Sequence, residues 1–467
     1  MKTRYIDLVE QTFDFPQDGF EVVDDALHFQ DIPLMDIIEQ YGTPLKISYL
    51  PKISSQIQKA KRFFNVAIAK ADYKGKYTYC YCTKSSHFSF VMEEALKNDI
   101  HIETSSAFDI PIIRNLHETG KISKDIYIIC NGYKRPVYTD YITELINDGF
   151  TNVIPVLDSQ TELKAYEANL RTNSKVKLGI RIASEEEPNF EFYSSRLGIR
   201  HDAIVDYYLS SIKDNPKFEL KMLHFFINTG IKDNSYYWSE LSKCINVYCD
   251  LKKVCPELDS MDIGGGFPIR TSLNFDYDYE YMADQIIQQI KNMCTQKQVP
   301  EPNIFTEFGS FTVGESGAVF YSITDQKQQN DNEKWYMIDS SFITTLPDTW
   351  GIKQRFILLA INKWDREYQR VNLGGLTCDS EDYYNSESHV NQVFLPKAEV
   401  NDEEPLYIGF FHTGAYQESL GGYGGIQHCL IPAPKHVIID RDKDGEITTR
   451  LFAKEQSAKS MLKILGY

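Results

Sequence analysis

The most informative segment of the sequence is Asp262-Ile263-Gly264-Gly265-Gly266-Phe267-Pro268, in which three glycines follow an apolar, strand-like run. A backbone without Cβ atoms lets another group approach closely. Consecutive glycine N–H groups also form a cup of donors for an anion, most often a phosphate. A plain loop explains a glycine triplet equally well, so its meaning depends on the fold around it.

Short β-branched or aromatic runs alternate with longer stretches of helical period between about residues 77 and 307, which is typical of βα units and a parallel sheet. Tyr279, Met282, Ile286 and Ile290 recur at steps of three and four, as they would in a helix. The candidate strands are Tyr77–Cys82, His101–Thr104, Ile126–Cys130, Asn152–Leu157, Val176–Ala183, Leu220–Ile227, Ser260–Ile263 and Asn303–Glu307.

Eight strands with eight connections predict a closed (β/α)8 TIM-type barrel, with the active site at the carboxyl ends of its strands. After residue 310, short runs broken by glycine and proline predict a β-rich C-terminal domain. We therefore expect an α/β protein in three parts. Residues 1–45 would pack with the β-domain and supply the candidate strands Phe20–Val23 and Leu27–Phe29, residues 46–310 would form the barrel, and residues 311–467 would form the β-domain.

The composition is that of a globular protein, since 42% of the 467 residues are hydrophobic and 25% are charged. No run approaches the roughly 18 apolar residues that a membrane span needs, and no secretory signal follows Met1. We expect a soluble protein without a membrane partner. The net charge of −17 argues against nucleic acid as a partner. Nine cysteines without paired or metal-ligand spacing favour a reduced, cytoplasmic chain with no metal site.

Two charged residues stand at strand ends of the predicted barrel. Lys84 ends an apolar strand, where apolar surroundings would lower the pKa of its amine and let it form a Schiff base. Glu307 closes the eighth strand, where a carboxylate can keep a pyridine nitrogen protonated. Taken alone, Lys84 could be a solvated lysine at a strand end, and Glu307 could be an ordinary salt-bridge partner. Together with the glycine cup they are the three contacts that pyridoxal 5'-phosphate needs, so the sequence predicts that cofactor.

With these residues the chain resembles the fold-type III, alanine racemase-like pyridoxal-phosphate decarboxylases that act on ornithine, diaminopimelate and arginine. The resemblance covers essentially the whole length. Two segments are similar to the biosynthetic arginine decarboxylases in particular: Leu346–Ile352, which reads LPDTWGI, and Gly414–Glu418, which reads GAYQE. The other matching segments are the surroundings of Lys84, Asp262–Pro268, Thr306–Gly309 and Leu376–Ser380.

The resemblance implies a role for each matching residue. Lys84 would hold the cofactor covalently, Glu307 would pair with its pyridine nitrogen, and Tyr416 would donate to its phosphate. Cys378 and Asp379 match residues that the family delivers from the neighbouring subunit, which implies a head-to-tail homodimer with shared active sites. The other implied cofactor contacts are Glu103, Arg181, His224, Phe226, Thr229, Gly264, Gly265, Gly266, Gly309 and Ser310.

Two positions depart from the family's pattern. Its phosphate segment commonly reads His-x-Gly-Ser, with the histidine stacked on the cofactor ring, and it aligns here with Phe226 to Thr229. An aromatic ring can still stack, and His224 would lie two residues earlier on the same strand face, so either residue is a candidate ring partner. Ser310 stands where many members carry an arginine. An arginine makes bidentate, charged contacts with a phosphate, and a serine does not replace them. We expect weaker cofactor binding unless backbone donors compensate.

The implied reaction is decarboxylation of a basic L-amino acid, with L-arginine giving agmatine, a polyamine precursor, as the favoured case. Cys378 is a candidate proton donor, and the alternative is that it is only a small buried residue without a chemical role. The candidates to bind the substrate's cationic end are Asp379, Glu381, Asp382 and Asp348, although Glu381 and Asp382 fit a solvated acidic loop equally well. Charge does not separate a guanidinium from an ammonium group, so the choice of arginine depends on the two segments similar to arginine decarboxylases.

Other activities remain open from the sequence. The nearest is the same chemistry on ornithine, lysine or meso-diaminopimelate, although the last would want a cation for its second carboxylate. A barrel alanine racemase would need a tyrosine acid/base and no Cys378-Asp379 segment. A non-catalytic, decarboxylase-like regulator would be expected to lose its cofactor contacts, whereas Lys84, the glycine cup and Glu307 are retained.

Overall fold

The computed structural model describes residues 3–185, 194–387, 390–399, 402–419 and 421–467. By its internal contacts the chain forms two compact units, which we call the barrel unit and the β-unit. The barrel unit comprises Ile53–Pro268 and Tyr277–Thr312. The β-unit comprises Met1–Lys52, Ile269–Asp276 and Val313–Tyr467.

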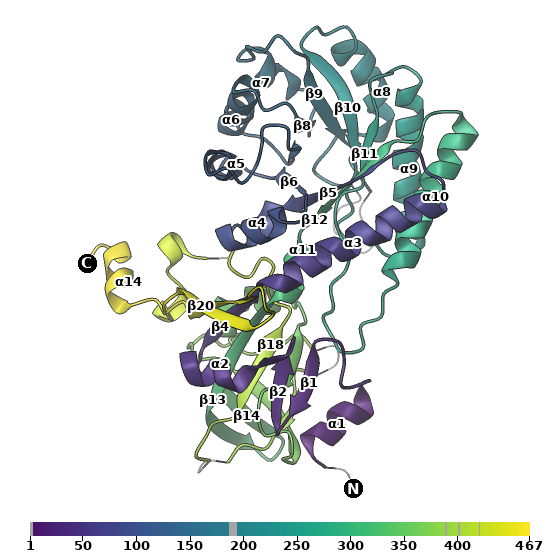
Figure 1. The fold of residues 1–467 in the computed structure, drawn as a ribbon. Helices are drawn as coiled ribbons and strands as arrows, with labels where there is room; N and C mark the ends of the chain where they lie inside the picture. The colour runs from purple at the N-terminus through teal and green to yellow at the C-terminus, as the bar shows by residue number, and fades with distance from the viewer. Residues whose placement is uncertain (1–2, 186–193, 388–389, 400–401, 420) are drawn as a thin grey trace. The chain divides into compact units, whose positions relative to one another are not determined.

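The barrel unit is built on a closed ring of eight parallel strands, which confirms the fold predicted from the alternation of strand and helix signals. Around the ring the strand order is β10-β11-β12-β5-β6-β7-β8-β9, and Figure 1 shows helices arranged around these strands. The strands are β5 (Tyr77–Cys82), β6 (His101–Thr104), β7 (Ile128–Cys130), β8 (Val153–Leu157), β9 (Val176–Arg181), β10 (Phe218–His224), β11 (Ser260–Asp262) and β12 (Asn303–Phe308).

Two long helices of the barrel unit start at residues whose side chains cap the helix. The Asn234 side chain accepts the N–H of Tyr237 at the start of α9, and Asp278 accepts that of Tyr281 at the start of α10, so both helices are capped. The α-helices are α3 (Leu50–Lys70), which begins in the β-unit, α4 (Ser89–Leu96), α5 (Asp109–Glu118), α6 (Pro136–Asn147), α7 (Leu163–Glu167), α8 (Ile204–Tyr207), α9 (Ser235–Lys252), α10 (Tyr279–Lys297) and α11 (Ser310–Val313).

The strand β10 is displaced from its predicted bounds. The sequence predicted a strand to Ile227, but the ladder ends at His224, and Phe225 N makes a last bond to Asp262 O at 2.9 Å. Beyond this point the chain turns, with Gly230 at a φ of +78°. Phe226 therefore lies in a loop, and the prediction that it shares a strand face with His224 is wrong.

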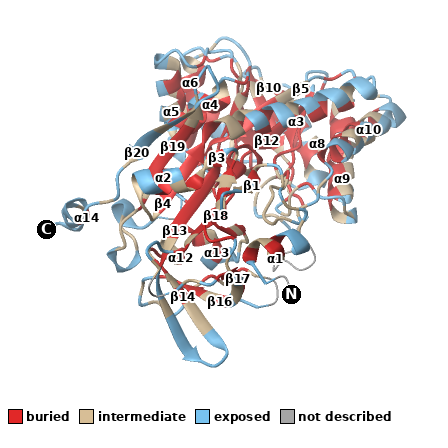
Figure 2. Cartoon of the chain, turned by 60° about the horizontal axis from the view of Figure 1, so that its bottom comes forward, coloured by how far each residue is buried: buried red, intermediate tan, exposed pale blue. Residues whose placement is uncertain are grey.

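The β-unit contains a nine-stranded sheet whose main path runs β17-β16-β14-β13-β4-β19-β20, with β18 paired to β13 and β15. The long strand β13 is buried over its first half and exposed at its far end, as Figure 2 shows. The strands are β4 (Leu45–Tyr49), β13 (Gly317–Asn330), β14 (Glu333–Ile338), β15 (Ile357–Ala360), β16 (Tyr368–Gly374), β17 (Val393–Pro396), β18 (Tyr407–Phe411), β19 (Lys435–Arg441) and β20 (Ile447–Ala453).

The N-terminal strands form a sheet of their own within the β-unit. β1 (Phe20–Val23), β2 (Ala26–Phe29) and β3 (Ile32–Pro33) pair only with one another among the sheets of the described residues. They pack into the same buried apolar cluster as the large sheet, in which Leu27 and Phe29 are fully buried. The N-terminal strand that does join the large sheet is β4. The helices of this unit are α1 (Tyr5–Thr12), α2 (Leu34–Tyr41), α12 (Phe342–Thr345), α13 (Pro347–Ile352) and α14 (Ala458–Leu465).

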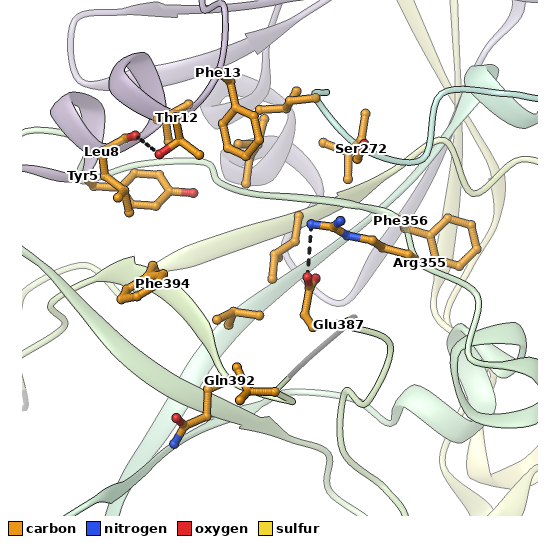
Figure 3. A pocket seen from close by; sticks show the side chains of 17 residues that line it. Tyr5, Leu8, Thr12, Phe13, Ser272, Arg355, Phe356, Glu387, Gln392 and Phe394 are labelled. Carbon is orange, nitrogen blue, oxygen red and sulfur yellow. Dashed lines mark hydrogen bonds and ion pairs between the residues drawn. The ribbon is translucent and has the colours of Figure 1, made fainter. Parts of the chain in front are cut away.

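A cavity of about 440 Å³ lies in the β-unit beside α1. Figure 3 shows an ion pair between Arg355 and Glu387, at 3.0 Å, among its mostly apolar lining. Within the described parts of the chain, no helix has both the length and the apolar character needed to cross a membrane.

Ile129 of β7 tests how far the barrel depends on its interior packing. It is fully buried in a cluster with Ile154, Val156 and Phe305. We expect Ile129→Ala to lower the free energy of unfolding by about 2–5 kcal/mol and Ile129→Val by about 0.5–1.5 kcal/mol, since each leaves a cavity. Urea unfolding followed by circular dichroism measures both losses.

Val66→Ala, on an exposed position of α3, is the control, and we expect it to change stability by less than about 0.5 kcal/mol. Equal losses at Ile129 and Val66 would contradict the barrel packing.

Candidate active site

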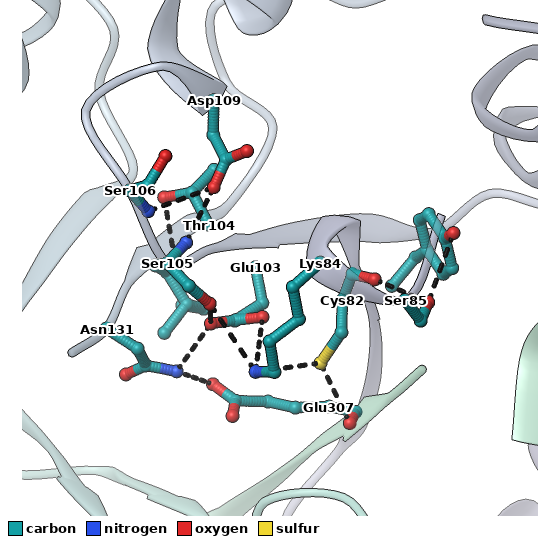
Figure 4. Close-up of polar contacts among 12 residues, drawn as sticks. Cys82, Lys84, Ser85, Glu103, Thr104, Ser105, Ser106, Asp109, Asn131 and Glu307 are labelled. Atoms are coloured by element: carbon teal, nitrogen blue, oxygen red, sulfur yellow. Dashed lines mark hydrogen bonds and ion pairs between the residues drawn. The ribbon is translucent and has the colours of Figure 1, made fainter. Parts of the chain in front are cut away.

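Lys84 lies in the turn Thr83–Ser85, directly after β5. Its Nζ is 3.3 Å from Glu103 Oε2 and 3.4 Å from Ser105 Oγ, as Figure 4 shows. The side chain is 47% exposed. The sequence predicted apolar surroundings for this amine, and that prediction is wrong, because the turn carries Lys84 beyond the apolar strand to a carboxylate. The ion pair holds the amine at the strand-end mouth of the barrel.

Glu103 and Asn131 connect Lys84 to Glu307 through a buried polar network (Figure 4). Glu103, in β6, is fully buried, and its Oε1 accepts from Ser105 Oγ at 2.7 Å and from Asn131 Nδ2 at 3.2 Å. The same Asn131 nitrogen donates to Glu307 Oε1 at 2.6 Å. One amide group therefore bridges two buried carboxylates and fixes the distance between them.

Glu307, in β12, is held as an ionised carboxylate although it is buried. Its Oε2 lies 3.1 Å from His224 Nε2. Burial alone would raise the pKa of Glu307, but the charge and hydrogen bond of His224 and the charge of Lys84 outweigh burial and lower that pKa below its ordinary value. A carboxylate that stays ionised is the group that a protonated pyridine nitrogen requires.

Asp262 behaves in the opposite way. It is fully buried at the end of β11, and burial together with the charge of Glu307 raises the pKa of Asp262 well above its ordinary value. Its Oδ1 accepts the N–H of Gly264 at 2.8 Å. Ligand atoms of His224, Asp262 and Glu307 lie within 4.8 Å of one another. Asp262 therefore binds the first glycine of the triplet, and its burial beside Glu307 disfavours a second negative charge at this place.

The triplet Gly264–Gly266 is required first by packing. A Cβ on Gly265 would lie 2.2 Å from the carbonyl oxygen of Glu307, and one on Gly266 would lie 2.6 Å from Gly230 Cα. Gly266 also has a φ of +115°, which favours glycine. These residues let three strand ends approach at backbone distance, so the glycine N–H groups lie where the strand ends meet.

Thr229 completes the surroundings of this cup. Its hydroxyl oxygen is buried and has no hydrogen-bond partner within the described ranges. The turn that carries it is fixed against the triplet, because Ile231 N donates to Gly266 O at 2.8 Å. An unpaired buried hydroxyl costs about 1–3 kcal/mol, and the oxygen of a bound phosphate would remove that cost.

Phe226 and His224, the two candidate ring partners, have different environments. His224 is 1% exposed and lies against Glu307. Phe226 is half-buried, and its ring lies beneath the guanidinium of Arg181, 5.7 Å from ring centroid to Cζ. Arg181 itself ends β9. Of the two, Phe226 is the aromatic surface at the mouth of the barrel, while His224 is engaged with the buried carboxylate.

Gly309 and Ser310 follow β12. A Cβ on Gly309 would lie 3.0 Å from Ser85 Cβ and 3.2 Å from Cys82 Cβ, so this glycine lets β12 approach the turn that carries Lys84. Ser310 is the first residue of the short helix α11.

The predicted residues Cys378 and Asp379 lie in the β-unit, after β16. Cys378 is exposed, and its Sγ lies 3.6 Å from Cys429 Sγ. Asp379 accepts the N–H of Glu381 at 2.9 Å and lies 3.7 Å from His428 Nε2. Asp382 is excluded as a substrate ligand, because it is buried and its carboxylate accepts the N–H groups of Phe342 and Thr377 at 2.8 and 3.0 Å.

The two segments similar to arginine decarboxylases are hydrogen-bonded to each other inside the β-unit. Gln417 Nε2 donates to Asp348 Oδ2 at 2.7 Å, and Asp348 N donates to Gln417 Oε1 at 3.3 Å. Tyr416, which directly precedes Gln417 in the second segment, has a φ of +67°, which is rare for a residue with a side chain. Glu418 forms an ion pair with Lys46 of β4, which anchors the far end of the turn.

The sequence pointed to Asn131 as a polar strand-end residue and to Asp262 as part of the glycine segment, but it assigned neither of them a role. Asn131 follows β7 and was visible as a polar strand-end residue, but an amide carries no charge that would single it out. Asp262 was read as part of the glycine segment. Only the closed ring brings these two strand ends, widely separated in sequence, beside Glu307.

Comparison with known proteins then decides the family. Residues 52–314, more than half of the chain, match the model of the pyridoxal binding domain of pyridoxal-dependent decarboxylases. The chain belongs to the pyridoxal-dependent decarboxylase family. Its cofactor is therefore pyridoxal phosphate, and the amine of Lys84, the ionised Glu307 and the cup beside Thr229 fit that molecule.

Members of this family named for different substrates resemble the chain. A biosynthetic arginine decarboxylase of Citrifermentans bemidjiense is 23% identical over 81% of this chain and 77% of its own length. The solved biosynthetic arginine decarboxylase of Campylobacter jejuni has a TM-score of 0.81 at 20% identity, covering 97% of this chain and 89% of its own. The diaminopimelate decarboxylase of M. jannaschii, solved with L-lysine, has a TM-score of 0.76 at 17% identity, covering 95% and 97%. The fold is therefore shared across substrates.

Gly265→Ala separates the packing role of the triplet from anion binding. We expect it to destabilise the cofactor-free protein by about 1–3 kcal/mol or more, because the new methyl group meets the carbonyl of Glu307. Urea unfolding of the protein stripped of cofactor measures the loss. Gly351→Ala, where a Cβ meets nothing within 4 Å, is the control. A variant as stable as wild type that binds the cofactor weakly would show that Gly265 serves the anion alone.

The lowered pKa of Glu307 gives a pH signature. Because the folded value lies below the ordinary 4.5, this group contributes stability that is fully present above about pH 4.5 and is lost as pH falls through the folded value. We expect Glu307→Gln to flatten the decline of unfolding free energy below pH 4.5, measured by urea titration at several pH values. Exposed Glu381→Gln should keep the wild-type profile, and an equal slope in both variants would refute the assignment.

Proposed function

We propose that this chain decarboxylates L-arginine, giving agmatine and carbon dioxide. The observation that carries the proposal is the network of Lys84, Glu103, Asn131 and Glu307 at one barrel mouth. It offers an amine and an ionised carboxylate in the arrangement that a pyridoxal decarboxylase uses. Pyridoxal phosphate, when bound, supplies an aldehyde that joins to amines and a ring that accepts the electrons left when carbon dioxide departs.

Lys84 is the residue that would hold the cofactor and exchange it with the substrate's α-amine. Glu103 and Ser105 orient its Nζ, at 3.3 and 3.4 Å. The carboxylate of Glu103 also balances the charge of the amine when the lysine is displaced. These contacts keep the amine at the mouth for the return step.

Glu307 would hold a proton on the pyridine nitrogen, and its neighbours keep it competent to do so. His224 Nε2 and Asn131 Nδ2 occupy one oxygen each, at 3.1 and 2.6 Å, and each carboxylate oxygen has a second lone pair to offer. Asn131 and Asp262 are positioning residues in this scheme. Phe226, whose ring lies beneath the guanidinium of Arg181, would cover the face of the cofactor ring.

The phosphate would be held by neutral donors more than by a cation. Gly264, Gly265 and Gly266 offer backbone N–H groups, Thr229 offers its hydroxyl, and Gly309 and Ser310 follow β12 close to the turn that carries Lys84. Tyr416 of the β-unit is a further proposed donor. Backbone donors at fixed positions compensate in part for the arginine that many members carry at the place of Ser310.

Cys378 is the proposed proton donor to the substrate's α-carbon. Its hydrogen bond with Cys429 raises the pKa of the Cys378 thiol above its ordinary value. The sulfur therefore carries a proton at neutral pH, as a donor must. Asp379 and Asp348 are the proposed partners of the guanidinium group, and burial raises the pKa of Asp348.

Arginine is preferred over ornithine, lysine and diaminopimelate because of Asp348 and Gln417. Their two mutual hydrogen bonds join the two segments that are similar to arginine decarboxylases. The relatives named above as arginine decarboxylases support the same choice.

A head-to-tail homodimer would bring Cys378 and Asp379 into the partner's barrel. Leu376 and Leu430, which flank the two facing thiols, are 50% and 46% exposed, and a second copy would cover them. Nine cysteines, all free thiols, support a reducing, cytoplasmic location.

A substrate panel with a lysine variant tests the proposal. We expect the wild-type protein to release carbon dioxide fastest from L-arginine when arginine, ornithine, lysine and diaminopimelate are supplied separately. Lys84→Arg keeps the charge and the partner of Glu103 but has no amine to join the cofactor, so borohydride should no longer attach a pyridoxyl group and activity should fall by several orders of magnitude.

Lys74→Arg, at a lysine that is 70% exposed, is the matched control and should retain both label and activity. Carbon dioxide release from ornithine but not from arginine would contradict the proposed substrate and leave the proposed decarboxylation chemistry intact. Release from none of the four would favour a non-catalytic regulator.

A further inference from the structure

Two thiols of this chain face each other at the surface of the β-unit. Of the nine cysteines, seven are buried, and the two exposed ones are Cys378 and Cys429. These two are 51 positions apart in sequence, yet their Sγ atoms lie 3.6 Å apart. Sulfur atoms at this distance are in contact.

A second contact holds the same two loops together. Asp379 Oδ2 lies 3.7 Å from His428 Nε2, so the neighbours of both cysteines are paired as well. The pairs run in opposite directions along the chain, 378 with 429 and 379 with 428. Cys429 and Leu430 both have a φ of +53°, a conformation that side-chain-bearing residues rarely adopt. The backbone of this turn therefore places the Cys429 side chain against Cys378.

We propose that Cys378 and Cys429 are a redox pair that a peroxide converts into an intrachain disulfide. A disulfide needs a sulfur separation of about 2.05 Å, so the two atoms must approach by roughly 1.5 Å. Rotation of two exposed side chains supplies a movement of this size. The seven buried cysteines are shielded from an oxidant in water.

The chemistry balances with one equivalent of hydrogen peroxide. One thiolate attacks a peroxide oxygen, the O–O bond breaks, and the sulfur becomes a sulfenic acid while hydroxide leaves and takes a proton to form water. The second thiolate then attacks that sulfur, the S–O bond breaks, and a second water leaves. Two thiols are oxidised, and peroxide is reduced to two waters. An external dithiol reverses the step by thiol–disulfide exchange.

The consequence for catalysis depends on the proposed function. If Cys378 donates the proton, its sulfur has no proton to give while it is bonded to Cys429. The disulfide would then switch off decarboxylation, and a reductant would restore it. A site that admits an amino acid admits peroxide, so the assembled enzyme remains accessible to the oxidant.

The first experiment detects the bond itself. The purified, full-length holoprotein is treated with a small excess of hydrogen peroxide. The cysteine thiols that remain free are then blocked, and the protein is digested without reductant. We expect a cross-linked peptide pair that joins Cys378 to Cys429 and a loss of two hydrogens from the intact mass, both reversed by dithiothreitol. Absence of that pair, or a link between Cys378 residues of two copies, would overturn the proposal.

The second experiment uses Cys429→Ser, which keeps the proposed donor Cys378. The activity of this variant before oxidation serves as its own baseline, and we expect peroxide inactivation that dithiothreitol no longer reverses fully, because the sulfenic acid has no resolving thiol and oxidises further. Cys255→Ala removes a buried thiol and is the control, expected to behave as wild type. Reversible inactivation in Cys429→Ser equal to wild type would count against the pair.

The two proposals fail separately. A cross-linked peptide from a protein that decarboxylates none of the four amino acids would leave the thiol pair intact and remove the proposed function. An active arginine decarboxylase that forms no such link would keep the function and remove the thiol pair.

Discussion

One buried negative charge governs the mouth of the barrel. Glu307 is almost completely removed from water, and a carboxylate in that position is costly unless donors surround it. His224, Asn131 and the amine of Lys84 provide this compensation, and the raised pKa of Asp262 disfavours a second charge beside Glu307. The side chains at the mouth of the barrel are therefore constrained by electrostatics before any ligand binds.

Backbone packing imposes the second constraint at the same place. Gly265 and Gly309 let β12 touch the strand ends on either side of it, at distances that leave no room for a Cβ. The charged carboxylate and the close approaches belong to the same strand. A substitution made to probe cofactor binding there also changes packing, so stability without cofactor has to be measured alongside affinity.

The sequence predicted the barrel well because its signals are local. Runs such as Tyr77–Cys82 and the period of α10 are properties of neighbouring residues, and the strand order around the ring follows from βα succession. The ends of β10 and the partners of Lys84 were predicted less well. Whether Lys84 meets apolar groups or Glu103 depends on a three-residue turn, and no local pattern reports it. Asn131 received no role from the sequence because its importance comes from two carboxylates distant in sequence.

The central position of β4 affects how the β-unit can form during synthesis. This N-terminal strand lies between β13 and β19, whose residues begin more than 250 positions later in the chain. Such long-range pairing gives high contact order and slow folding. On the ribosome, one edge of β4 stays unpaired until β13 has been made and the other until β19 has been made, so chaperone capture of nascent chains should centre on this segment.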